Sequence, residues 1–207
     1  MIGSQKVYEL LKTNYKKEQI TPFLSLFARL DEFSDEKKII AIEGGSASGK
    51  TTLAEMLQRV YDCTVFHMDD FFLRPQQRTP ERYSEIGGNI DRERFLAEVL
   101  EPLSRGKEIN YQRFDCSKMA LDEIEHIVPK KLVIVEGAYS MHPEFERFYD
   151  FSVFLNISAE LQKKRILKRN SPLMAERFFN EWIPLEQKYF SHFNIPKKCG
   201  LEITIIE

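Results

Sequence analysis

The segment GGSASGKT, residues 44–51, has the residue types and the spacing that bind a nucleoside triphosphate. It fits the pattern G-x-x-x-x-G-K-[ST] at every fixed position, and it lies between a strand-like apolar run and a helix-like run. Glycines let successive backbone N–H groups point inward at phosphates, and the N-terminus of the following helix adds partial positive charge. The Lys50 side chain can then reach the β- and γ-phosphates, and the Thr51 hydroxyl can ligate Mg²⁺.

This phosphate-binding loop defines the residues that we expect to bind the nucleotide. They are Gly44, Gly45, Ser46, Ala47, Ser48, Gly49, Lys50, Thr51 and Thr52. The alternative for the segment is a flexible Gly/Ser-rich turn, and Thr52 could be an ordinary helix residue. The position of the loop between two regular elements favours the phosphate-binding interpretation.

Acidic residues follow two other apolar runs and could complete a phosphoryl-transfer site. Asp69 and Asp70 come after the run 64–68, and Glu136 lies at the end of the run 131–137. The carboxyl ends of parallel strands face the ligand crevice. One aspartate could accept the proton of a substrate hydroxyl or hold Mg²⁺, and Glu136 could hold Mg²⁺ directly or through water. The alternatives are a turn cap for one aspartate and a salt bridge for Glu136.

The segment 159–178 carries a concentration of basic residues. Arg165 and Arg169 are four positions apart and therefore share one face of a helix. Basic residues on helices are usually only solvated, which is a fair interpretation of Lys163 and Lys164. Beside a phosphate-binding loop, however, a lid over about 165–180 could close cations onto the transferring phosphoryl group. We expect the lid arginines to be Arg165, Arg169 and Arg177.

Alternating apolar and amphipathic runs predict the elements that position these residues. The expected strands are 37–44, 64–68, 131–137, 150–157 and the C-terminal segment LEITIIE. The expected helices are 5–19, 22–33, 50–61, 91–103, 159–169 and a helix-rich segment 173–190. A long loop is expected at 73–90, and a hairpin or an irregular excursion at 108–129. Strands that alternate with helices predict an α/β domain with a mainly parallel sheet. We expect residues 1–36 to form a helical extension before the domain 37–207. The extension either packs on the core or forms a subunit contact in a homo-oligomer.

The composition excludes several classes of protein. A net charge of −2 argues against a dedicated nucleic-acid binder, and no apolar run approaches the roughly 18 residues that cross a bilayer. The three cysteines are far apart and form no CxxC motif, which is typical of reduced thiols in a cytoplasmic protein. A GTPase is also disfavoured, because the strings D-x-x-G and N/T-K-x-D do not occur.

The chain resembles the uridine kinase and phosphoribulokinase-like P-loop kinases, whose relatives include nicotinamide riboside kinases and pantothenate kinases. The motifs GGSASGKTT, HMDDFF, GGNIDRERF, LVIVEG and RILKRN occur in the family's order, and the resemblance covers residues 37–190. It implies a P-loop kinase fold with a doubly wound sheet and a helical lid, together with the use of ATP and Mg²⁺. By this match Asp69 takes the catalytic-base position beside Lys50, and Glu136 is the magnesium-associated acid. Thr51 and Asp69 are the other expected metal contacts.

The family match also suggests where the acceptor binds. Asp91 lies near the acid that holds substrate ribose hydroxyls in the family, although it could instead cap a helix. Tyr83, Tyr111 and Arg113 are further candidate contacts that could equally be loop or hairpin surface. The histidine that follows the hairpin segment in uridine kinases has no counterpart near NYQRFDC.

The sequence therefore predicts a kinase that transfers the γ-phosphoryl group of ATP to a small-molecule hydroxyl acceptor. The acceptor is nucleoside-like, with uridine or cytidine first. The alternatives are a kinase for nicotinamide riboside, pantothenate or a sugar phosphate, and a non-catalytic nucleotide-sensing protein.

Overall fold

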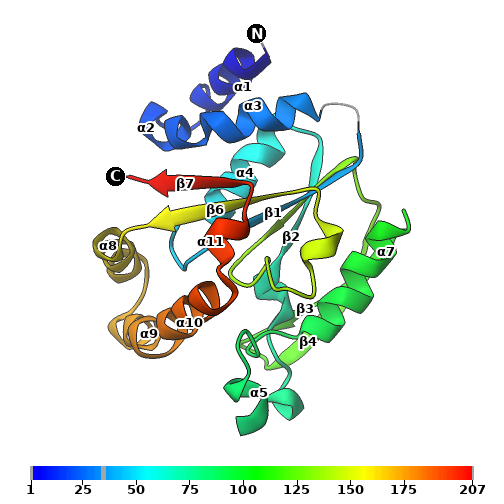
Figure 1. Cartoon of the computed structure of the whole chain (residues 1–207), viewed down its shortest axis with the longest axis vertical. Coiled ribbons are helices and arrows are strands. Elements are labelled where there is room, and N and C mark those ends of the chain that lie inside the picture. The colour runs from blue at the N-terminus through cyan, green and yellow to red at the C-terminus, as the bar shows by residue number, and fades with distance from the viewer. Residues whose placement is uncertain (1, 34–35, 207) are drawn as a thin grey trace.

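The computed structural model describes residues 2–33 and 36–206, and these residues contain a five-stranded parallel sheet with helices on both faces (Figure 1). The strands lie in the order β2-β5-β1-β6-β7, with every neighbouring pair parallel. Their bounds are β1 Lys38–Gly44, β2 Cys63–His67, β5 Leu132–Glu136, β6 Phe151–Ile157 and β7 Leu201–Ile205. The predicted doubly wound α/β fold is confirmed. All five strands end at one edge, and the residues after them meet there.

The central strand β1 is apolar on both faces because each face is covered. Ile40 and Ile42 pack into one hydrophobic cluster, and Ala41 packs into the other. This double burial explains why the run does not alternate between apolar and polar residues. The first cluster contains α4 (Lys50–Val60) and the N-terminal helices, and the second contains the helices that follow β2 and the C-terminal helices.

The N-terminal extension packs on the sheet through shared core contacts. Its elements are α1 Ile2–Leu11, α2 Lys17–Ile20, the 3₁₀ turn η1 Thr21–Phe23 and α3 Leu24–Glu32. Leu10, Phe27 and Leu30 are buried in the same cluster as Leu53 and Leu57 of α4. The extension is therefore part of the core that supports the phosphate-binding loop.

The predicted helix 5–19 is wrong in its second half, because the chain turns between α1 and α2. The Thr13 hydroxyl and backbone N–H both donate to the Leu10 carbonyl, at 2.6 and 3.0 Å, which closes the first helix. Threonine competes in this way for backbone groups and so favours helix ends. Gln19 then accepts from the Lys16 backbone N–H at 2.8 Å, where α2 begins.

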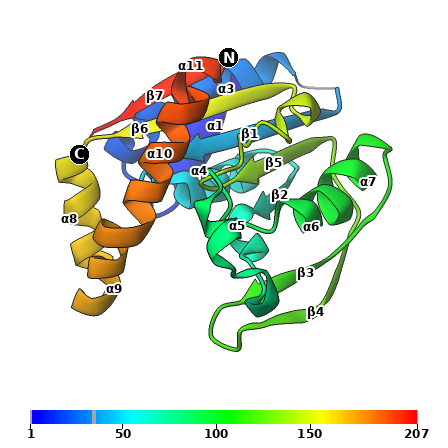
Figure 2. The ribbon, with the colours of Figure 1, turned by 60° about the horizontal axis from the view of Figure 1, so that its bottom comes forward.

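The other face of the sheet carries the helices around the candidate site (Figure 2). The 3₁₀ turn η2 Met68–Phe71 follows β2. The predicted long loop 73–90 contains η3 Pro75–Gln77 and α5 Pro80–Ser84. A helix continues through α6 Arg92–Phe95, a π-helical turn Leu96–Leu100 and α7 Glu101–Ser104. Of the two predicted possibilities for 108–129, the structure has the hairpin: β3 Ile109–Asp115 and β4 Ala120–Ile127 pair antiparallel, and β3 packs against η2. A short 3₁₀ turn, η5 Glu146–Phe148, precedes β6.

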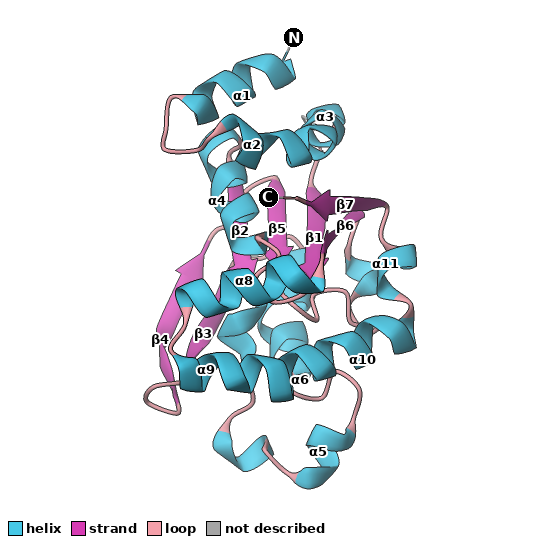
Figure 3. Cartoon of the chain, turned by 90° about the vertical axis from the view of Figure 1, so that its left-hand side faces the viewer, coloured by secondary structure: helices cyan, strands magenta, loops and turns pink. Residues whose placement is uncertain are grey.

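The predicted lid forms a helical arm beside the carboxyl edge of the sheet (Figure 3). It contains α8 Ala159–Arg169, α9 Pro172–Arg177 and a π-helical segment Phe178–Trp182. The arm is followed by α10 Ile183–Phe193 and α11 Ile195–Lys198. No helix among the described residues combines the length and the hydropathy needed to cross a membrane.

Candidate active site

A cavity of about 710 Å³ opens at the carboxyl edge of the sheet, beside the phosphate-binding loop. Most of the residues predicted from the sequence as site residues line it. These are Ser46, Ala47, Ser48, Gly49, Lys50, Thr51, Thr52, Asp69, Glu136, Arg165 and Arg169. They come from segments after β1, β2, β5 and β6, so the parallel sheet brings them to one place.

The loop geometry requires glycine at both fixed positions. Gly44 has a φ of +151° and Gly49 a φ of +103°, which side-chain-bearing residues rarely adopt. A Cβ at Gly44 would also lie 2.7 Å from the carbonyl oxygen of Leu155 on β6. Glycine therefore lets the loop turn tightly against the neighbouring strand.

Lys50 lies inside the curve of this loop. Its side chain is buried, and Nζ donates to the carbonyl oxygens of Gly44 and Gly45 at 2.8 and 3.0 Å. Gly44 and Gly45 are not among the residues that line the cavity, whereas Lys50 is. A buried cation at this place would attract phosphate oxygens strongly, because solvent screens it little.

Two of the three candidate magnesium residues, Thr51 and Glu136, contact each other, and the third, Asp69, lines the same cavity. The Thr51 hydroxyl donates to Glu136 Oε1 at 3.1 Å, and Nδ1 of His67 lies 2.6 Å from the same oxygen. The carboxylate raises the pKa of His67. Among the described residues no group of three or more His, Cys, Asp or Glu side chains could hold a metal. The site nevertheless fits Mg²⁺, which is usually held by one or two carboxylates plus substrate phosphates.

The two consecutive aspartates have different surroundings. Asp69 lines the cavity, and partial loss of its hydration raises the pKa of its carboxyl group against the opposing effect of Lys50. Asp70 turns toward the hairpin, where it accepts from the Tyr111 hydroxyl at 3.3 Å and lies 3.8 Å from Nε of Arg113. The structure thus places Asp69 in the cavity, whereas Asp70 joins β3 to η2.

Helix α8 contacts the phosphate-binding loop directly. Arg165 Nη1 donates to the carbonyl oxygens of Ala47 and Ser48 at 3.1 and 3.4 Å. Arg169 lines the cavity, and its charge acts on Asp69. Arg177 does not line the cavity, because it pairs with Glu181 and stacks on the Trp182 ring. Two of the three predicted lid arginines are therefore at the site.

Glu186 on α10 is a site residue that the sequence pattern did not reveal. Its buried carboxylate accepts from the Ser46 backbone N–H at 2.9 Å and from the Ser46 hydroxyl. Gln162 of α8 donates to the Ser46 carbonyl at 2.8 Å, so both helices hold the same residue. Burial raises the pKa of Glu186. No motif predicts this contact, which joins residues 140 positions apart.

Glu43, the residue before the loop, is a second residue that the pattern did not reveal. It is fully buried and accepts from the backbone N–H groups of Gly44, Tyr139 and Met141 at 2.9–3.1 Å and from the Tyr189 hydroxyl at 3.1 Å. Burial raises its pKa to about 7. Glu43 thus fixes the segment after β5 and α10 relative to the phosphate-binding loop.

Replacing Glu43 with alanine should destabilise the protein strongly. Several buried donors would lose this acceptor, and each unpaired group costs about 1–3 kcal/mol. We expect Glu43→Ala to lower the free energy of unfolding by about 3 kcal/mol or more in urea denaturation. Glu176→Ala, at an exposed position of α9, is the control and should change it by less than about 0.5 kcal/mol. Equal stability of the two variants would contradict the anchoring role of Glu43.

The predicted acceptor contacts do not line the cavity. Asp91 is fully buried and caps α6 by accepting from the Arg94 backbone N–H at 3.3 Å, with Arg74 Nε at 3.2 Å. Asp91 therefore caps a helix, which was the alternative to its predicted contact with the acceptor. Tyr83 is exposed on α5, and Arg113 pairs with Glu125 on the hairpin surface. Tyr111 is buried between Phe66 and Phe71.

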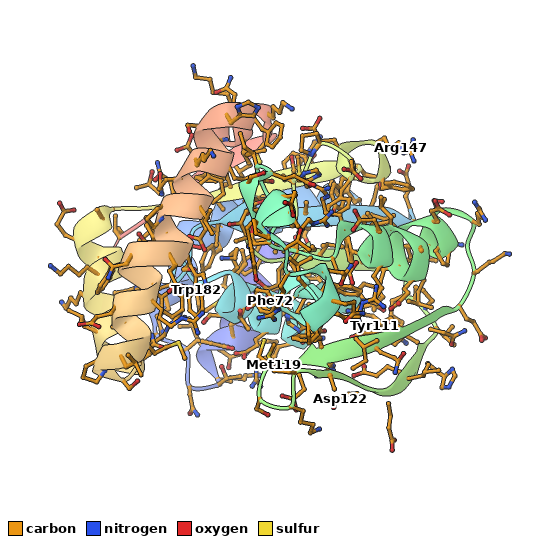
Figure 4. All side chains as sticks on the ribbon, turned by 90° about the horizontal axis from the view of Figure 1, so that it is seen from below. Phe72, Tyr111, Met119, Asp122, Arg147 and Trp182 are labelled. Atoms are coloured by element: carbon orange, nitrogen blue, oxygen red, sulfur yellow. The ribbon has the colours of Figure 1, made fainter. Side chains whose placement is uncertain are left out.

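Other residues line the end of the cavity near Asp69. They are Phe72, Asn89, Ile90, Ala138, Tyr139, Phe178 and Trp182. Figure 4 shows Trp182 on the α9–α10 side and Phe72 in the middle, with Tyr111 beyond it on the hairpin side. The chain contains a single tryptophan, just after the predicted lid 165–180, and its rarity was the available sequence signal. Aromatic side chains therefore make up part of the cavity wall.

Comparisons with known proteins agree with this geometry. The family model for the phosphoribulokinase / uridine kinase family matches residues 39–177. Uridine kinase-like protein 4 of Arabidopsis thaliana is 25% identical over 178 residues, covering 81% of this chain and 38% of that protein. The uridine kinase of Clostridium perfringens (strain ATCC 13124) is 26% identical over 184 residues, covering 81% and 86%.

A solved structure shares the fold. The structure described as a possible uridine kinase from Bacillus stearothermophilus has a TM-score of 0.63 at 20% identity, covering 86% of this chain and 99% of that one. The family match takes in β1, the phosphate-binding loop, β2 with Asp69, β5 with Glu136 and the basic helix α8. This chain belongs to the phosphoribulokinase / uridine kinase family.

Proposed function

We propose that this protein is a kinase that transfers the γ-phosphoryl group of ATP to a hydroxyl group of a nucleoside-like molecule. A uridine- or cytidine-like acceptor is the first candidate. The observation that carries the proposal is the position of Asp69 in the same cavity as Lys50, Thr51 and Glu136. A phosphate-binding loop alone supports nucleotide binding, and a carboxylate facing it supports transfer to a hydroxyl group.

The position of each residue in the cavity indicates its role in the proposed reaction. Backbone N–H groups of the loop and the Lys50 ammonium bind the β- and γ-phosphates, and Asp69 accepts the proton of the acceptor hydroxyl. The hydroxyl oxygen attacks the γ-phosphorus, and the bond to the β-phosphate oxygen breaks to release ADP. Arg169 lies beside Asp69 and stabilises negative charge on the transferring group. Most of the acceleration comes from this positioning and electrostatic stabilisation.

Thr51 and Glu136 would hold Mg²⁺ together with the phosphates. The ion, when bound, neutralises charge on the β- and γ-phosphate oxygens. Lys50 and the loop remain responsible for orienting the triphosphate.

The acceptor end of the cavity supports a flat, nucleoside-like ligand. Phe72, Tyr139 and Trp182 supply aromatic surface near Asp69, and Asn89 supplies an amide. Aromatic rings commonly stack on bases, and a few polar groups fix their orientation. The free state of Cys63, Cys116 and Cys199 is consistent with a cytoplasmic enzyme.

A screen of acceptors tests the proposal. ADP release would be measured with Mg²⁺ and ATP against nucleosides, nicotinamide riboside, pantothenate and sugar phosphates, with Lys50→Ala as the blank. We expect acceptor-dependent ADP release with at least one pyrimidine nucleoside. ATP binding without acceptor-dependent release across the panel would contradict the kinase proposal and favour a nucleotide-sensing protein.

The single tryptophan provides a direct binding signal. Trp182 lines the cavity, so a ligand there changes its surroundings and its emission. We expect saturable changes in tryptophan fluorescence when ATP or the acceptor is added. Trp182→Phe should abolish the signal while the protein still binds ATP in calorimetry. An unchanged spectrum at saturating ligand would show that the ligand does not reach this wall.

A further inference from the structure

The site cavity extends past the phosphate-binding loop in two directions. The order of the strands in the sheet shows which residues lie on each side of the loop. The loop follows β1 at the centre of the sheet, and Asp69 and Tyr139 follow β2 and β5 on one side. The opposite end of the cavity includes Ile205 and Ile206, at the end of β7, which is the outer strand on the other side of β1. The cavity thus has an end near Asp69 and an end near β7.

The N-terminal extension forms one wall of the β7 end. Its lining residues are Glu18, Gln19, Pro22 and Phe23. The turn η1 packs against β7, and Figure 1 shows α2 beside the C-terminal end of that strand. These residues lie before the segment 39–177 that the family model matches, so this wall is an addition to the matched part of the chain.

We propose that residues 18–23 form a wall of the pocket for the base of the donor nucleotide, and that Gln19 contacts the base. This inference rests on the proposed function, because transfer requires the γ-phosphate to face Asp69. The α- and β-phosphates then lie along the loop, and the nucleoside part of the donor extends toward the β7 end. A base there is the occupant that follows from a triphosphate held in the loop.

The chemistry of this wall suits a heterocyclic base. Pro22, Phe23 and Ile205 supply apolar surface for a ring. Gln19 is exposed, and its Oε1 accepts from the Lys16 backbone N–H at 2.8 Å. That bond orients the amide and leaves its N–H groups to donate to ring nitrogens of the base. Gln19 would therefore determine base affinity without touching the reacting atoms.

Comparing ATP with inorganic tripolyphosphate isolates contacts to the nucleoside part. Both would be titrated with Mg²⁺ into the full chain by calorimetry. We expect the wild-type protein to bind ATP at least about tenfold more tightly than tripolyphosphate, because contacts to the base add to the phosphate contacts. Gln19→Trp fills the β7 end and should weaken ATP binding by at least about tenfold. Its affinity for tripolyphosphate should stay within about twofold, because phosphate contacts are unchanged.

Two further variants complete the experiment. Gln19→Ala removes the amide without adding bulk and should weaken ATP binding by about threefold, again with tripolyphosphate unchanged. Gln5→Ala, at an exposed position of α1 away from the cavity, is the matched control and should change neither affinity. Thermal unfolding shows whether each variant is folded. If Gln19→Trp does not fold, the comparison of Gln19→Ala with the wild type tests the inference.

The outcomes separate this inference from the proposed function. If Gln19→Trp binds ATP as tightly as the wild type, the base does not lie at this wall, and the kinase proposal stands. If Gln19→Trp lowers the affinities for ATP and for tripolyphosphate equally, the extension acts on the phosphate-binding loop, and the inference is also wrong. If the wild-type protein binds neither ligand, the proposed function itself fails.

Discussion

Asp69→Asn is expected to lower kcat by about 10²–10⁴-fold, the contribution typical of a positioned general base. The asparagine amide keeps the size of the side chain but cannot accept the proton of the acceptor hydroxyl. The affinity for ATP should change little, because the proposed function assigns the phosphate contacts to the loop and to Lys50 rather than to Asp69. Acceptor-dependent ADP release measures kcat, and Trp182 fluorescence measures ATP affinity.

Asp70→Asn is the matched control for this variant. Asp70 contacts Tyr111 and Arg113 on the hairpin, so its loss should change kcat by much less than the loss of Asp69. The pH profile adds a second measurement. The pKa of Asp69 is raised, so activity should fall as the pH falls through a value above the ordinary range of aspartate, where the base becomes protonated. Full activity of Asp69→Asn, or loss of activity only in Asp70→Asn, would contradict the assignment.

Lys50→Met is expected to have the second large effect, a loss of about 10²–10³-fold in kcat together with weaker binding of ATP. The buried ammonium lies within the curve of the loop, on the carbonyl oxygens of Gly44 and Gly45, and we propose that this loop binds the phosphates. Methionine keeps most of the chain length and removes the charge. ADP release at saturating acceptor measures the first effect, and fluorescence titration measures the second.

A stability measurement distinguishes charge from folding in this variant. Lys50→Met leaves the Gly44 and Gly45 carbonyls without their side-chain donor, so thermal unfolding must be compared with wild type. Lys163→Met, at an exposed position of α8, is the matched control and should leave kcat and ATP affinity unchanged. A folded Lys50→Met variant with wild-type ATP affinity and turnover would show that the loop does not bind the transferring phosphates.

The strands, the phosphate-binding loop and the cavity acids were predictable because their signals are local. Buried parallel strands are short apolar runs, and a loop of the form G-x-x-x-x-G-K-T requires particular backbone torsions at Gly44 and Gly49. A parallel sheet makes its strand ends meet at one edge, so the positions of Asp69 and Glu136 after two apolar runs are enough to assign both to the site. The hairpin and the cap at Asp91 were local signals as well, although the sequence left the role of Asp91 open.

The acceptor residues were not predictable in the same way, because burial and long-range contacts determined them. Tyr111 matched a plausible pattern, but its ring is buried against Phe66 and Phe71 and does not line the cavity. Arg113 pairs with Glu125 on its own hairpin, and Arg177 pairs with Glu181 one helical turn further along the chain. Residue type alone does not distinguish a side chain that binds a ligand from one that pairs within the protein.

By itself, the sequence determined the order of strands and helices along the chain, the phosphate-binding loop and the acids at the ends of the strands. Only the tertiary structure decided which of two aspartates faces the cavity, that Glu43 and Glu186 hold the loop, and that the N-terminal extension lines the cavity. The physical reason is the range of the interactions. Backbone torsions and hydrophobic periodicity are set by neighbouring residues, whereas the partner of a buried carboxylate is set by how distant helices pack on the sheet.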